Sequence, residues 1–163
     1  MITLKNILSI FLIITLCSCN NNKEVFIEFK GIEGGWEKKD KINFNFYLQE
    51  KGNYDISIIL RSDEQYPFSN IYFDYQLTSK MVNLSESKMM DINDSNTNWY
   101  SKRVLSISNN IIELKKNLLL NEGNVILSLE HSVRFLDSIN PILNLEGVLD
   151  IGLLVKKSND EKI

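Results

Sequence analysis

Alternation of apolar and polar side chains at every second position is the feature of this 163-residue sequence that most constrains its fold. It runs through residues 42–48, 54–60 and 71–77, each with large apolar side chains at alternate positions. Successive side chains of a β-strand point to opposite faces, so such a segment can bury one face in a core and turn the other toward water. The pattern predicts three half-buried strands.

Shorter runs of β-branched, leucine and aromatic residues predict further strands. These runs are residues 25–29, 104–107, 111–120, 125–131 and 148–155. Clusters of glycine, asparagine and other turn-forming residues separate the strands. The clusters are residues 34–35, 51–53, 108–110 and 121–124. Strand and turn signals alternate closely enough along the chain to predict an antiparallel meander.

Helical patterns are confined to two short stretches, residues 85–92 and 132–139. In the second stretch apolar residues recur at intervals of three to four, and Pro141 would end the turn. Neither a long helix nor an internal repeat accompanies the many short strands. The predicted fold class is therefore all-β: an antiparallel β-sandwich with short strands and at most one or two short helical turns.

The N-terminal residues have the pattern of a bacterial export signal. Lys5 precedes an apolar run over residues 7–16, and Leu16-Cys17-Ser18-Cys19 comes directly after it. An aliphatic residue three before a cysteine and a small residue immediately before it form a lipobox, which fits Cys19 and does not fit Cys17. The run of about ten residues is too short for a bilayer-spanning helix, which needs about twenty. Cys19 is therefore predicted to carry the lipid.

This prediction divides the chain into three parts: residues 1–18 as a lipoprotein signal peptide, residues 19–23 as a short polar tether and residues 24–163 as a single β-sandwich domain. With Cys17 removed and Cys19 acylated, no cysteine remains for a disulfide or a metal site in the mature chain. Contact with the membrane through the lipid anchor is expected, because two or more acyl chains anchor a protein stably.

The composition offers no basis for catalysis, a cofactor or a metal site. The formal net charge is −3 with dispersed basic residues, so nucleic acid is not an expected partner. His131 is the single histidine, and no Gly-x-Ser-x-Gly motif accompanies it. Residues 91–96 lack the glycine and glutamate of a calcium loop, and the adjacent Asp63 and Glu64 would point to opposite faces of a strand. We expect a protein that is not an enzyme and has no small-molecule substrate.

Five aromatic residues lie in or beside predicted turns. They are Trp36, Tyr66, Phe68, Tyr72 and Trp99. Two interpretations stay open for them: exposed rings on a sandwich could stack on sugars, as in a carbohydrate-binding module, or the rings could close the ends of the core. The second is favoured, because nothing in the sequence shows that these rings are exposed.

Several motifs together resemble a known family. Gly35-Trp36 is followed by Lys38 and Asp40, and Tyr66-Pro67-Phe68-Ser69-Asn70 opens a predicted strand. Glu130-His131-Ser132-Val133-Arg134 ends another, and residues 145–152 read Leu-Glu-Gly-Val-Leu-Asp-Ile-Gly. Through these segments, and most specifically through Tyr66 to Asn70, the sequence resembles the GldH family of gliding-motility lipoproteins of Bacteroidetes over most of the mature chain.

The resemblance implies a non-enzymatic outer-membrane lipoprotein that supports gliding motility and the associated type IX secretion machinery by contact with other proteins of that machinery. It leaves open whether the protein faces the periplasm or the cell surface. The candidate contact surface lies near one end of the sandwich, at Trp36, Tyr66, Pro67, Phe68 and Asn70. A surface-anchored carbohydrate-binding module is the alternative, and a hydrolase is a third hypothesis.

The lipobox makes a direct prediction. Replacing Cys19 with alanine abolishes acylation and membrane retention, because the thiol that accepts the lipid is lost, whereas Cys17→Ala leaves both intact. Mass spectrometry of the mature N-terminus measures acylation, and membrane fractionation measures retention. A free amino terminus downstream of Cys19 would contradict the prediction.

Overall fold

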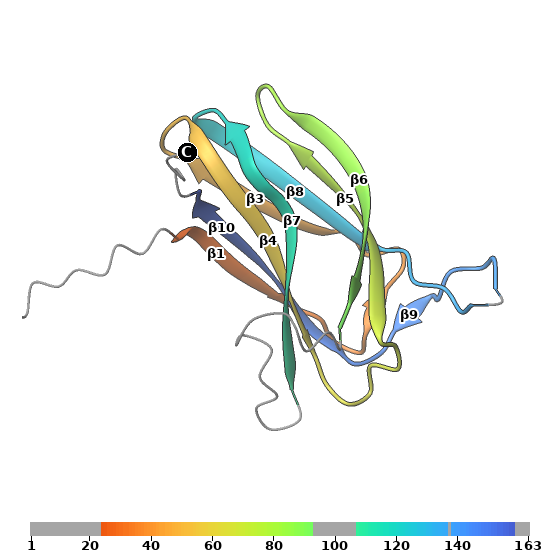
Figure 1. The fold of residues 1–163 in the computed structure, drawn as a ribbon. Helices are drawn as coiled ribbons and strands as arrows, with labels where there is room; N and C mark the ends of the chain where they lie inside the picture. Colours follow the sequence, from red (N-terminus) through yellow and green to blue (C-terminus); the bar gives the residue numbers. More distant parts are fainter. Residues whose placement is uncertain (1–23, 93–106, 137, 159–163) are drawn as a thin grey trace, which may run out of the picture.

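Two four-stranded antiparallel sheets pack face to face in the computed structural model, which describes residues 24–92, 107–136 and 138–158 (Figure 1). The first sheet has the order β1-β10-β4-β7, with bounds Glu24–Gly31, Val148–Lys157, Gly52–Ser62 and Ser108–Leu120. The second has the order β3-β8-β5-β6, with bounds Ile42–Leu48, Gly123–His131, Asn70–Thr78 and Asn83–Asp91. A short ladder joins β2 (Trp36–Glu37) to β9 (Asn144–Leu145). The predicted all-β sandwich is confirmed, and the described residues contain no helix that could cross a membrane.

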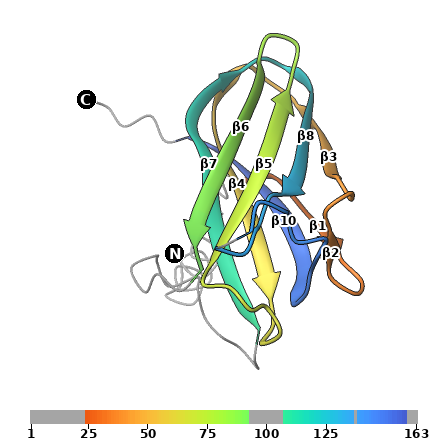
Figure 2. The same cartoon turned by 90° about the vertical axis from the view of Figure 1, so that its right-hand side faces the viewer.

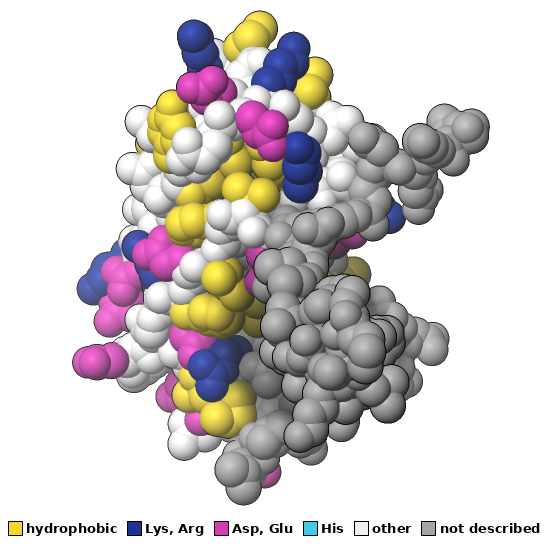
Figure 3. Space-filling model, turned by 90° about the vertical axis from the view of Figure 1, so that its left-hand side faces the viewer, with side chains coloured by type: hydrophobic (Ala, Val, Ile, Leu, Met, Phe, Trp, Pro, Cys, Tyr) yellow, Lys and Arg dark blue, Asp and Glu magenta, His cyan; other side chains and the backbone are white. Residues whose placement is uncertain are grey.

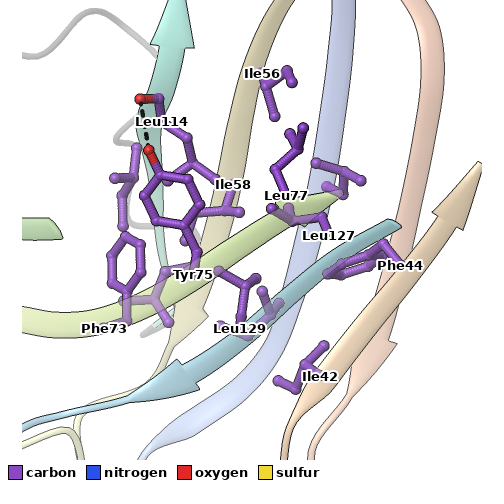
Figure 4. Close-up of a cluster of buried hydrophobic side chains, with 14 of the residues drawn as sticks. Ile42, Phe44, Ile56, Ile58, Phe73, Tyr75, Leu77, Leu114, Leu127 and Leu129 are labelled. Carbon is purple, nitrogen blue, oxygen red and sulfur yellow. Dashed lines mark hydrogen bonds between the residues drawn. The ribbon is translucent and has the colours of Figure 1, made fainter. Parts of the chain in front are cut away.

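Alternation along the strands places the large apolar side chains between the sheets. Strand β3 alternates buried and exposed residues at every position, and its Phe44 is fully buried. Facing side chains from both layers fill the interior around it, among them Ile58 of β4, Leu77 of β5 and Leu127 of β8 (Figure 4). The period-two pattern of the sequence thus becomes one shared core.

Side-chain contacts also join the two layers near their edges. On one side, Phe26 of β1 stacks on Phe46 of β3 with 5.1 Å between the ring centroids. Toward the other side, the Tyr75 hydroxyl donates to Glu86 Oε2 at 2.8 Å and to the Leu114 carbonyl at 3.4 Å, which links β5 to β7 (Figure 4). The first contact joins the edge strands β1 and β3, and the second joins β5 to the edge strand β7. The two sheets are therefore held together on both sides of the sandwich.

The antiparallel register defines two ends of the sandwich. Strand β1 begins at Glu24, which pairs with Lys156 of β10, and this end of the molecule is here named the tether end. At the other end, named the distal end, Gly31 pairs with Asp150. Residues 63–69, which connect β4 to β5, and the segment that connects β8 to β9 lie at the distal end (Figure 1).

The prediction of helical turns is wrong at both stretches as far as the structure describes them. Residues 85–92 belong almost entirely to strand β6, which pairs with β5 along its full length. Hydrogen bonds and side-chain packing between paired strands outweigh a weak local preference for helix. These interactions join residues that are distant in the chain, so a local sequence pattern does not predict them. In the described part of residues 132–139 the chain forms no helix, and Arg134 makes an isolated antiparallel bridge with Pro141.

The predicted turn at residues 108–110 is also wrong, because these residues begin strand β7. Asn110 pairs with Leu60 and is 3% exposed, so its backbone continues the ladder instead of reversing the chain. The other predicted strands are confirmed, apart from residues 104–107, of which 104–106 lie outside the described residues and Ile107 precedes β7. The predicted meander is wrong, because among the described strands only β5 and β6 are both consecutive in the chain and paired with each other.

The core makes a stability prediction. Phe44→Ala lowers the free energy of unfolding by about 3–5 kcal/mol, because it removes a fully buried ring and leaves a cavity. Asn45→Ala is the control, since Asn45 is exposed on the same strand and its truncation changes stability by about 0.5 kcal/mol or less. Urea denaturation followed by circular dichroism measures both. Similar losses for the two variants would contradict the assigned faces of β3.

Candidate contact surface at the distal end

The turn between β4 and β5 is held in shape by its own side chains. The Tyr66 hydroxyl donates to the Asn70 carbonyl at 2.8 Å and so closes the turn. Burial raises the pKa of Tyr66, so the hydroxyl stays protonated and can donate at neutral pH. Pro67 is exposed and fixes its own φ, while Phe68 lies half-buried beside it. Four residues predicted to share a surface are therefore brought together in one turn.

Gly147 allows the segment after β9 to pack against this turn. Its φ is +76°, and a Cβ at this position would overlap the backbone nitrogen of Tyr66. The Gly147 carbonyl also accepts the Asp63 N–H at 2.9 Å. Only a residue without a side chain fits such a close approach in this conformation. Two of the motifs in the sequence, residues 66–70 and 145–152, are thus neighbours in space.

Trp36 does not belong to this surface, which corrects the prediction that placed it there. Strand β2 pairs Trp36 with Leu145 of β9, and the indole is only 1% exposed. Its Nε1–H donates to the Asp40 carbonyl at 2.9 Å, which satisfies the polar group that burial would otherwise leave unpaired. Trp36 therefore closes the distal end of the core from inside.

His131 lies at the end of β8 and is fully buried. The Trp36 ring meets the imidazole edge-on with 5.4 Å between centroids, and Lys38 Nζ donates to the His131 carbonyl at 2.7 Å. Desolvation and the positive charge of Lys38 lower the pKa of His131, so the ring is neutral at pH 7. The imidazole fills space in the core and has no access to solvent.

A groove lies between the Tyr66–Asn70 turn and the segment after β8. It has a volume of about 790 Å³ and is here named the distal groove. Its lining comes from the turn, from outward residues of β5 and β6 and from the segment after β8. Figure 2 shows the strands β5 and β6 facing the viewer. The lining residues are Pro67, Phe68, Ser69, Asn70, Tyr72, Asp74, Ser87, Ser132, Arg134, Phe135, Leu136 and Ser138. Three of the predicted contact residues therefore share one concave surface.

The rim of the distal groove is apolar and faces water. The rings of Phe68 and Phe135 lie 5.8 Å apart at 59° to one another. Phe135 is 63% exposed and Leu136 is 100% exposed, and farther along the same segment Ile139 and Leu143 are also largely exposed. Single exposed apolar residues are common on proteins, but these four lie within one nine-residue segment beside a groove.

The floor of the groove is polar. Asp74 accepts the Ser87 hydroxyl, and the Ser132 N–H donates to the Tyr72 carbonyl at 2.8 Å. Arg134 is exposed and makes no ion pair with any residue that the structure describes. An aromatic rim with an arginine beside it has the composition that is enriched in protein interfaces.

Sequence reasoning missed Arg134, Phe135 and Leu136 as surface residues. The apolar residues of this stretch, Val133, Phe135, Leu136 and Ile139, recur at intervals of three to four and so indicated a helix, which would have turned these positions inward. Trp99 and residues 93–96 of the acidic loop lie outside the described residues. Within the described part, no three histidine, cysteine, aspartate or glutamate side chains stand close enough to hold a metal ion.

Comparison with known proteins agrees with the motifs. A profile of the family described as GldH lipoprotein matches residues 24–155. The chain belongs to this family. A "Gliding motility lipoprotein GldH homolog" of Christiangramia forsetii is 25% identical over 154 residues, which cover 93% of this chain and 94% of that protein. The predicted resemblance is confirmed, and the chain is a GldH-like lipoprotein of a family implicated in gliding motility.

Among solved structures, Eiger TNF from S. frugiperda is similar to the GldH-family chain at a TM-score of 0.32 and 10% identity. The match covers 88% of this chain and 92% of the other. A score at this level carries no argument about fold or function.

The packing of Gly147 makes a prediction about the turn. Gly147→Ala lowers the free energy of unfolding by about 2–4 kcal/mol, because the new Cβ meets the Tyr66 backbone in a left-handed conformation. Gly34→Ala is the control: its φ is +72° but nothing lies within 4 Å of its Cβ, so only about 1–2 kcal/mol is lost. Urea denaturation separates the two. Equal losses for the two variants would show that the contact between Gly147 and the turn contributes nothing to the free energy of unfolding.

Proposed function

We propose that this GldH-family chain is an outer-membrane lipoprotein that supports gliding motility and the associated type IX secretion machinery by binding another protein of that machinery through the distal groove. The observation that carries the proposal is the rim of the groove, where Phe135 and Leu136 are exposed by 63% and 100%. These large apolar side chains are exposed to water beside the groove. A partner that covers them lowers the free energy of the complex, because apolar surface is removed from water. Membership in the GldH lipoprotein family supports the cellular role.

The chemistry of the groove suits a protein segment that carries an apolar anchor and an acidic group. Complete burial of a side chain such as Leu136 contributes about 1.5–3 kcal/mol. Arg134 offers a planar pair of donors for a carboxylate, and the floor residues Asp74 and Ser132 offer polar contacts. Area alone does not set affinity, but an arginine and an aromatic ring together are the usual anchors of a protein interface.

One wall of the groove is preorganised. The hydrogen bond from Tyr66 to Asn70 and the close packing of Gly147 fix the turn that carries Pro67 and Phe68. A wall that is already in place loses little conformational entropy when it binds, which raises affinity for a given contact area. The binding side chains thus project from a rigid base.

The groove lies at the distal end, whereas the predicted tether joins the tether end. Strand β1 runs between the two ends and has eight residues, a length of about 26 Å. A partner in the groove would therefore meet the domain well away from the residue that carries the lipid. This arrangement suits a membrane-anchored protein that offers a binding end to its surroundings.

We propose contact rather than catalysis as the way the groove acts. Its charged lining residues are Asp74, which already accepts a hydrogen bond from Ser87, and Arg134. His131, the single histidine of the chain, is enclosed behind Trp36 and does not line the groove. These placements favour recognition over acid–base chemistry.

Carbohydrate binding remains the alternative function to be tested. Stacking on a sugar needs an open ring face, and Tyr72 in the groove is 43% exposed. The neighbouring rings are not arranged as a flat platform, because Phe68 is inclined at 77° to Tyr66 and at 59° to Phe135. The rim therefore fits a protein side chain better than a row of sugar rings.

The test compares the groove with another exposed apolar position. Leu136→Asp places a charge on the rim and is expected to abolish colony spreading and to lower secretion of type IX substrates in a gliding host. Met81→Asp is the control, because Met81 is 78% exposed but lies in the β5–β6 turn at the tether end. Thermal melting checks that both variants stay folded, which is expected because neither side chain is buried.

A photocrosslinking amino acid at the same two positions identifies the contact in native membranes. The proposal expects one protein adduct from position 136 that is absent from position 81, and loss of this adduct with Arg134→Glu. Normal spreading by Leu136→Asp would overturn it. Loss of polysaccharide binding by the variant, with motility intact, would establish the carbohydrate alternative instead.

A further inference from the structure

The outward face of the first sheet carries an apolar row that spans all four strands. Phe29 of β1 lies opposite Gly152 of β10, which lies opposite Ile59 of β4, which lies opposite Ile111 of β7. In the next row on this face, Ile27 lies opposite Leu154. The residues Ile27, Phe29, Ile59, Ile111 and Leu154 are here named the apolar stripe, and Figure 3 shows this face with a band of hydrophobic side chains along it.

The edge of the stripe on β1 is exposed to solvent. Ile27 is 51% exposed and Phe29 is 44% exposed, whereas Ile59 and Leu154 are covered by their neighbours. Gly152 gives the Phe29 ring room to lie over β10, because a Cβ there would stand 2.5 Å from the ring. The absence of a side chain at residue 152 thus brings the ring down onto the sheet.

The second sheet is polar at the equivalent row of its outward face. This row across its four strands is Asn43, Ser128, Gln76 and Ser85, all polar and uncharged. Figure 2 shows the strands of this face. Apolar side chains also occur on this face, because Tyr47, Tyr72, Met89 and Ile126 are each 43–51% exposed, but they do not form a row across all four strands.

The position of the stripe along the chain indicates what covers it. Cys19, the predicted lipid-bearing residue, lies five residues before Glu24, where β1 begins, so a fully extended chain between them spans at most about 18 Å. Ile27 and Phe29 are among the first outward residues after that point. A lipid anchor at Cys19 keeps these side chains near the bilayer at high effective concentration, where a modest apolar surface is enough for contact.

We propose that the apolar stripe rests on the phospholipid bilayer that holds the lipid anchor, as a second membrane contact of the domain. The proposal depends on acylation of Cys19 and not on the identity of the partner in the distal groove. In this orientation the strands run along the membrane surface and the outward face of the second sheet points to water. The distal groove opens on that outward face, through Tyr72 and Asp74, and stays accessible to a partner.

The test uses the full-length acylated protein in vesicles of phosphatidylethanolamine and phosphatidylglycerol. A single cysteine, Ile27→Cys or Tyr47→Cys, carries an environment-sensitive fluorophore. The two positions are matched, because both side chains are 51% exposed and each lies on the edge strand of its sheet, but they belong to opposite outer faces. Flotation with the vesicles is measured first, so a failure of the anchor at Cys19 is recognised separately.

The proposal expects quenching at position 27 by a nitroxide on the lipid acyl chains to exceed that at position 47 by about threefold or more, since an interfacial apolar face reaches about 5–10 Å into the headgroup region. Iodide in the water should quench in the reverse order. Equal access of iodide to both positions would overturn the proposal. Protection of position 27 from both quenchers would also overturn it, because a second protein surface would then cover the stripe.

A second variant excludes insertion driven by the fluorophore itself. With the label moved to Ile111→Cys on β7, the double change Ile27→Ser and Phe29→Ser removes the apolar edge on β1 without touching the labelled strand. Loss of acyl-chain quenching at position 111, with an unchanged melting temperature, supports contact through the stripe. Asn43→Ser with Asn45→Ser on β3 is the matched control. Retained quenching in the β1 variant would show that the stripe does not hold the domain on the bilayer.

Discussion

The burial of two apolar inner faces is the constraint on which the rest of this structure depends. Because the side-chain period of a strand is two, a slip of one residue between any two strands would turn a whole apolar face toward water. In the second sheet, Phe44, Leu127, Leu77 and Leu84 stand opposite one another across four strands, and three of them are fully buried. The core therefore fixes the register, and the register fixes which residues meet at each end.

At the distal end, the register determines which connecting segments lie together and form the surface. The core brings the ends of β4 and β8 to the same end of the molecule, and polar contacts then shape the connecting segments that leave these two strands. Individually such hydrogen bonds contribute about 0.5–1.5 kcal/mol, so their role is to select one conformation of a turn that the core alone would leave free. The contact of Tyr66 with Asn70 acts in this way after β4, and the contact of Trp36 with Asp40 does the same in the connection from β2 to β3.

The sequence predicted those parts of the fold that are recorded in local pattern. Residues 42–48 and 71–77 could be assigned because each strand alternates by itself between core and solvent. Strand β6 could not, because it lies at an edge with almost all of its side chains exposed, and its pairing with β5 is the interaction that makes it a strand. Edge strands of this kind carry little apolar pattern for sequence reasoning to find.

The same limit applies to the site. Residues 66–70 were recognisable as one turn because proline and an aromatic pair define it locally, but the burial of Trp36 depends on Leu145, more than a hundred positions away in the chain. Exposure of Phe135 and Leu136 is likewise a property of where the chain passes, since their spacing alone indicated a buried helical side. Local sequence identifies which residues are distinctive; only tertiary structure tells which of them face water.

The outer faces of a sandwich are not needed for its core, which makes their composition informative. The core requires only that the inner faces are apolar and well packed. Apolar residues on an outer face therefore either make another contact or lower the solubility of the protein. This chain has such residues on the first-sheet face near the predicted anchor and in the segment beside the distal groove, whereas on the second-sheet face exposed apolar residues such as Ile126 and Met89 share the surface with the polar row that contains Asn43 and Gln76. The two apolar regions point in different directions, so covering one does not hide the other. A protein built in this way can lie against a membrane and still offer a groove to a partner, which is what an anchored component of a larger assembly requires.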